Sequence, residues 1–119
     1  FDHKSEVLRG HCESLGRDFS EITRSSNFNT IVADTEAEAR DRLAAVKDRL
    51  LPHVGQERAD AIEQDYLGSD GFGTLEQIVE RLTARAEHGL GYSIHYFPEL
   101  AYDSSGAELF EREVIPALS

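Results

Sequence analysis

The chain has 119 residues, of which 39% are hydrophobic and 29% charged, a composition that suits one small globular domain. Its 12 basic and 23 acidic side chains give a net charge of −11, which argues against a general binder of the nucleic-acid backbone. No apolar run approaches the roughly 18 residues of a membrane span. We therefore expect a soluble, cytoplasmic protein that binds neither nucleic acid nor membrane.

The sequence contains no methionine and opens on Phe1. A translation product starts with methionine, so this pattern indicates a processed chain or a piece of a longer one. Cys12 is the only cysteine, which leaves no internal disulfide and no cysteine-cluster metal site. The histidines are scattered without the spacing of a zinc site, and no metal site is predicted.

The first predicted element is a helix over residues 3–16. Its apolar side carries Leu8, His11, Cys12 and Leu15, with Cys12 as a buried, inert thiol. Gly16 is a plausible stop for this helix. Residues 27–33 then alternate and are rich in β-branched side chains, which is typical of a strand.

A longer helix is expected from Thr35 to about Leu51. Thr35 is a good N-cap with Glu38 three residues on to close a capping box, and Pro52 is expected to end the helix. A shorter helix is predicted over residues 58–67.

The stretch from Gly71 to Glu99 organises the rest of the chain. The glycine-rich segment 68–73 is either a tight loop or a phosphate cradle, although it lacks the spacing of a P-loop or dinucleotide fingerprint. Thr74 and Gln77 form the capping box of a helix that Gly89 stops.

Residues 91–97 are the clearest strand. We expect Tyr92, Ile94 and Tyr96 to face one way and Ser93, His95 and Phe97 the other. Because both sets contain large apolar side chains, the strand is interpreted as covered on both faces. Pro98 ends it, and a last helix is predicted over residues 105–118.

Strands that alternate with helices predict an α/β fold with a parallel sheet of about three strands. Such a sheet has two open edges and little covered area. The chain is therefore expected to form a homo-oligomer or to pair with further strands of its own.

The carboxyl ends of parallel strands are where α/β folds place their sites. This rule selects Asp34 and Thr35 after the first strand, Gly73 and Thr74 before the capped helix, and His95 to Glu99 after the last strand. His95 and Glu99 are the candidate catalytic groups. The alternatives are a histidine satisfied by neighbouring groups, an exposed loop carboxylate at Glu99, and a simple helix start at Thr74.

Four segments together resemble the luciferase-like monooxygenase family. They are VLRGHCESLGRDFSEITRS at 7–25, IVADTEAEAR at 31–40, GTLEQIVERL at 73–82 and LFEREVIPAL at 109–118. The third resembles the family's Gly-Thr-Pro-Glu-Gln helix start, with Leu75 where proline is usual.

Members of that family are (β/α)8 TIM barrels that use reduced flavin (FMN) or the deazaflavin coenzyme F-420. The resemblance implies that residues 1–119 are a single segment, the C-terminal part of such a barrel, and that the chain alone is inactive and holds no cofactor tightly. It also implies that Gly73 and Thr74 are cofactor-binding residues on one side of the barrel's pocket. A full barrel takes about 250 residues, so this chain cannot close one. The alternative is a stand-alone, non-catalytic α/β module that self-associates.

Overall fold

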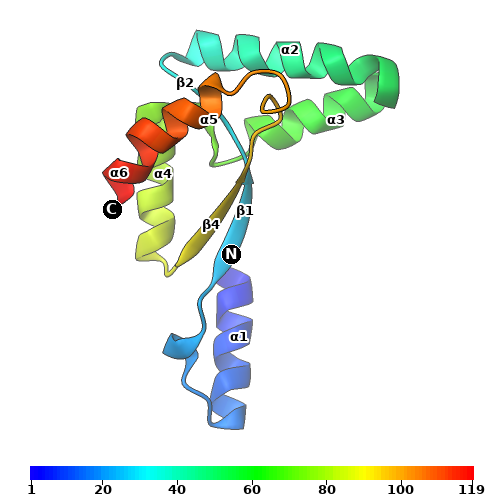
Figure 1. The fold of residues 1–119 in the computed structure, drawn as a ribbon. Helices are drawn as coiled ribbons and strands as arrows, with labels where there is room; N and C mark the ends of the chain where they lie inside the picture. Colours follow the sequence, from blue (N-terminus) through cyan, green and yellow to red (C-terminus); the bar gives the residue numbers. More distant parts are fainter.

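The computed structural model describes residues 1–119 and has an α/β fold with five helices and four short parallel strands in two small sheets (Figure 1). The helices are α1 (Asp2–Leu15), α2 (Glu36–Val54), α3 (Gln56–Leu67), α4 (Leu75–Glu87) and a C-terminal helix built from α5 (Ser105–Leu109), a π-helical turn (Phe110–Val114) and α6 (Ile115–Leu118). The strands are β1 (Ser25–Asn29), β2 (Ile31–Ala33), β3 (Phe72–Thr74) and β4 (Tyr92–Tyr96). They confirm the α/β class and the parallel pairing, and they do not close into a barrel.

The single strand predicted over residues 27–33 is wrong, because the chain changes partner at Thr30. Before Thr30, β1 pairs with β4; after it, β2 pairs with β3. The Thr30 N–H donates to the Tyr96 carbonyl at 2.8 Å, and the next N–H, of Ile31, donates to the Gly71 carbonyl at 3.1 Å. The backbone thus leaves one sheet and enters the other within two residues.

The order of the strands differs from the order in the wall of a (β/α)8 barrel. Consecutive strands are usually neighbours in such a wall, yet β4 pairs with β1 and not with β3. Strand β3 has three residues and pairs with β2 alone.

Two clusters of buried side chains cover the two faces of β2. On one face Ile31 and Ala33 pack with α2, α3 and Phe72. On the other face Val32 packs with α4 and the C-terminal helix through Ile78, Leu82, Phe110 and Val114. Strand β2 is therefore covered on both faces, which was expected only of the strand over residues 91–97.

That expectation is wrong for β4. Its three large side chains on one face are exposed, Tyr92 at 61%, Ile94 at 38% and Tyr96 at 54%. They alternate as predicted with Ser93 and His95, but no element of the chain packs on their side. Helix α4 and the C-terminal helix cover only the other side of the β1–β4 pair (Figure 1).

Several helix ends follow the sequence. The Thr74–Gln77 capping box starts α4, and Gly16 ends α1 in the left-handed conformation. At Thr35 the expected box is half formed, since its hydroxyl accepts from the Glu38 N–H while the Glu38 side chain turns to an arginine.

The expectation that Pro52 ends its helix is wrong, because α2 continues to Val54. Pro52 falls in the last turn of the helix, where its missing N–H costs a single bond, and Gly55 then closes the helix.

Helix α1 stands apart from the rest (Figure 1). It packs along the turn Phe19–Glu21, where Cys12 is buried as predicted, but Leu15 at its far end is 82% exposed. The radius of gyration is 16.7 Å, whereas a compact domain of this length has about 13.5 Å. None of the helices combines the length and the apolar composition that a membrane crossing requires.

Candidate functional site

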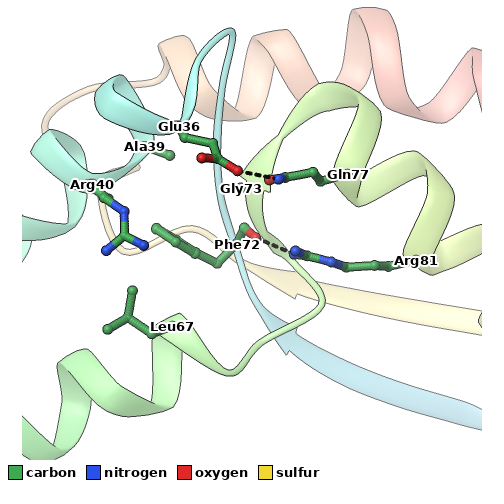
Figure 2. Close-up of a pocket in the computed structure, with 8 residues that line it drawn as sticks. All are labelled: Glu36, Ala39, Arg40, Leu67, Phe72, Gly73, Gln77 and Arg81. Carbon is green, nitrogen blue, oxygen red and sulfur yellow. Dashed lines mark hydrogen bonds between the residues drawn. The ribbon is translucent and has the colours of Figure 1, made fainter.

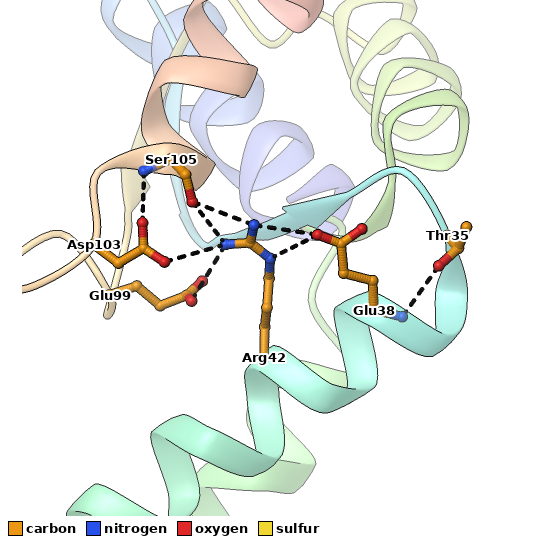
Figure 3. A network of polar contacts seen from close by, with 6 residues as sticks. All are labelled: Thr35, Glu38, Arg42, Glu99, Asp103 and Ser105. Atoms are coloured by element: carbon orange, nitrogen blue, oxygen red, sulfur yellow. Dashed lines mark hydrogen bonds and ion pairs between the residues drawn. The ribbon is translucent and has the colours of Figure 1, made fainter.

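The carboxyl ends of β2, β3 and β4 lie near the start of α2, and two hollows open there. One is a pocket at Gly73, between α2, α3 and α4 (Figure 2). The other is a shallow groove at Glu99, between α2 and the loop that follows β4 (Figure 3). Gly73 thus lines one hollow and Glu99 the other, while Thr74 lines neither.

Thr74 starts α4 through reciprocal hydrogen bonds. The Gln77 N–H donates to the Thr74 hydroxyl at 3.3 Å, and the Thr74 N–H donates to the Gln77 side-chain carbonyl at 3.1 Å. The first N–H groups of a helix have no intrahelical acceptor, and in α4 the cap satisfies that of Gln77. Gly73 has φ +143°, and a Cβ there would collide with the Gln77 side chain.

Charged groups of both signs line the pocket at Gly73, whose volume is about 240 Å³. Arg81 donates to the Phe72 carbonyl at 2.6 Å, and Gln77 donates to the Glu36 carboxylate at 2.6 Å (Figure 2). Arg40 is exposed on the opposite wall. The pocket therefore offers one exposed cation, Arg40, while Glu36, Gln77 and Arg81 already make hydrogen bonds.

Arg42 organises the second hollow (Figure 3). Its guanidinium lies 3.3 Å from the Glu38 carboxylate, 3.4 Å from Glu99 and 3.9 Å from Asp103, and it donates to the Ser105 hydroxyl at 3.3 Å. These groups come from α2, the loop after β4 and the start of α5. The network thus ties three segments together at the carboxyl end of β4.

Glu99 is 8% exposed, so it is not the exposed loop carboxylate that the sequence left as an alternative. Burial raises the pKa of Glu99, and the Arg42 guanidinium partly opposes that rise. A carboxyl group with a raised pKa beside a groove is the kind of group that acts as an acid or base. A buried carboxyl group is equally typical of a structural ion pair, and Glu99 already forms one with Arg42.

His95 lies on the covered face of β4. Its ring stacks on Phe28, with centroids 5.3 Å apart, and lies 4.4 Å from the Phe110 ring. Nδ1 is 2.8 Å from the Thr30 hydroxyl and Nε2 is 3.0 Å from the Ser93 hydroxyl. Burial lowers the pKa of His95, which keeps the imidazole neutral at pH 7.

The four predicted site residues are therefore not brought together. His95 packs against Phe28 and Phe110, and Glu99 contacts Arg42. Gly73 lines the pocket between α2, α3 and α4, and Thr74 caps α4. The sequence reasoning missed Arg42, which organises the groove at Glu99. It also missed Asn27 and Asn29, which pair in register with Ile94 and Tyr96 on the uncovered face. Polar residues alternating with Phe28 could have indicated this face.

No group of three or more histidine, cysteine, aspartate or glutamate side chains is arranged to hold a metal ion. The chain matches no known protein family and no curated protein.

Proposed function

We propose that the chain is the C-terminal part of a luciferase-like oxidoreductase or monooxygenase that uses coenzyme F-420 or reduced flavin. The observation that carries this proposal is the resemblance of four segments in the family's order, from residue 7 to residue 118. In the whole enzyme the coenzyme would supply hydride transfer or oxygen activation, and this segment would supply part of the wall and one lip of the pocket.

Two structural features support the proposal. The segment GTLEQ begins helix α4 with a full capping box between Thr74 and Gln77. This agrees with the helix start that the resemblance implies. The β1–β4 pair is covered by helices on one face and open on the other, as a stretch of barrel wall would be once separated from the remaining strands.

The residues present fit one end of such a coenzyme only in part. Of the groups that line the pocket at Gly73, the Arg40 guanidinium would bind a phosphate group and the Glu36 carboxylate would oppose it. A cavity of about 240 Å³ is smaller than the roughly 300–1,000 Å³ of pockets that enclose drug-sized ligands, so it has no room for the ring system. We therefore expect the isolated chain to be inactive.

The test begins with the mass of the intact gene product, which should correspond to about 300 residues. That product and the 119-residue chain are then titrated with F-420 and with reduced FMN, following absorbance and fluorescence. The proposal expects saturable binding by the longer product and none at micromolar concentration by the short chain. An intact product of about 119 residues, or turnover by the short chain, would contradict it.

The second candidate is a stand-alone, non-catalytic α/β module. Two observations favour it: β4 pairs with β1 in place of β3, and β2 is covered by helices on both faces, as in an open sheet with helices on both sides. A gene product of this length that binds no coenzyme would support this candidate.

A further inference from the structure

One face of the β1–β4 pair has no covering element, and we call it the open face. Its residues are Ser25, Asn27, Asn29, Tyr92, Ile94 and Tyr96, which share a side of the sheet because they pair in register. The three large side chains are contributed by β4, and 61% of Tyr92 and 54% of Tyr96 remain exposed.

The open face carries no charge. All six residues are neutral, in a chain whose net charge is −11 and in which 29% of residues are charged. Two copies of the chain repel each other over most of their surface, but they can meet here without burying a charge. Asparagine and tyrosine side chains also supply hydrogen-bond donors and acceptors on both sides of such a contact.

The exposed surface of the chain is larger than a monomer of its size has. A protein of 13.3 kDa exposes about 6,450 Å², whereas this chain exposes 7603 Å². The difference, about 1,150 Å², exceeds the roughly 800 Å² that each partner buries in a standard interface. This surplus belongs to the whole chain, including helix α1, which stands apart (Figure 1), and a contact through the open face would bury part of it.

We infer that the 119-residue chain forms a two-fold symmetric dimer in which the open faces of two copies pack together. The two sheets would stack about 10 Å apart, with Ile94 near the centre and the tyrosines around it. Edge-to-edge pairing of the strands is not the contact, because it would leave Tyr92, Ile94 and Tyr96 in water. The inference does not rest on the proposed function.

The experiment measures molar mass by light scattering after size exclusion, at 1–100 μM chain. The wild type should have about 27 kDa, twice the 13.3 kDa of one chain. Ile94→Asp should shift it to 13.3 kDa, because two buried carboxylates would face each other at the axis. The matched control is Ile115→Asp, since Ile115 is 50% exposed on the C-terminal helix, and this variant should stay dimeric.

A monomeric wild type, or a dimer that Ile94→Asp leaves intact, overturns the inference. If Ile94→Asp loses its far-UV circular dichroism, Ile94→Cys replaces it with a short bis-maleimide cross-linker. Native Cys12 is only 4% exposed, so the wild type is the blank. Ile94→Cys should give a cross-linked dimer and Ile115→Cys should not, whereas equal cross-linking of the two overturns the inference.

Discussion

At the scale of single residues, Glu99 depends on Arg42. Glu99 is almost fully buried, and the guanidinium of Arg42 is the only cation within ion-pair distance of its carboxylate. Arg42→Ala would leave that carboxylate uncompensated, which costs about 2–3 kcal/mol of the free energy of unfolding. Urea denaturation at pH 7.5 measures the loss.

Two further variants distinguish the loss of the ion pair from a general destabilisation caused by replacing Arg42. Arg42→Ala combined with Glu99→Gln should recover part of the loss, since no buried charge then remains. Arg112→Ala is the control, because the Arg112–Glu113 pair is exposed and its removal should change stability by less than about 0.5 kcal/mol. A double variant no more stable than Arg42→Ala would contradict this explanation.

His95 links stability to pH. Its folded pKa lies below the ordinary value of 6.5, so the unfolded chain binds more protons than the folded chain in that range. The contribution of His95 is therefore fully present at pH 8 and is lost as pH falls through 6.5 toward the folded pKa. The free energy of unfolding should decrease between pH 8 and 5.5.

The matched variant for this prediction is His95→Phe, which keeps an aromatic ring between Phe28 and Phe110. Its stability should depend less on pH over the same range. The raised pKa of Glu99 has the opposite effect, since it increases the free energy of unfolding as pH falls. Glu99 is present in both proteins, so its effect cancels in the difference between their pH profiles. Parallel pH profiles of the two proteins would show that His95 does not titrate on unfolding.

At the scale of elements, the switch of the chain from one sheet to the other depends on Gly71. A Cβ on Gly71 would lie 2.6 Å from the Thr30 hydroxyl and 2.8 Å from the Asn29 carbonyl. Gly71→Ala should therefore cost about 2–3 kcal/mol of stability, as overpacking of a core does. Thermal unfolding measures the cost.

Gly10 supplies the control within the same chain. It lies inside α1, and a Cβ there would meet no atom within 4 Å, so Gly10→Ala should stabilise the protein by about 0.5–1 kcal/mol. A loss at Gly10 as large as that at Gly71 would point to a general effect of alanine.

The elements that the sequence predicts well are those with a local cause. The capping residues Thr74 and Gln77 and the stop at Gly16 act within a turn or two, so their neighbours along the chain suffice to locate them. The break at Thr30 and the exposure of Tyr92 depend on which distant strand arrives, and an alternating pattern carries no information about that. The same limit applies to the four predicted site residues. The sequence located the strand ends that carry them, but not the distant segments that each residue contacts.

At the scale of the whole molecule, the proposed dimer would couple stability to concentration and to salt. Association through the open face would stabilise the folded chain by mass action, so Tm should rise by about 2–3 °C for each tenfold increase in concentration. Because each copy carries a net charge of −11, raising NaCl from 20 to 300 mM should screen the repulsion and tighten the dimer. A partner held by opposite charge would show the reverse dependence on salt. Differential scanning calorimetry of the wild type and Ile94→Asp at 5 and 500 μM is the measurement. The variant should have one Tm at both concentrations, and a wild-type Tm that also fails to move would contradict the coupling.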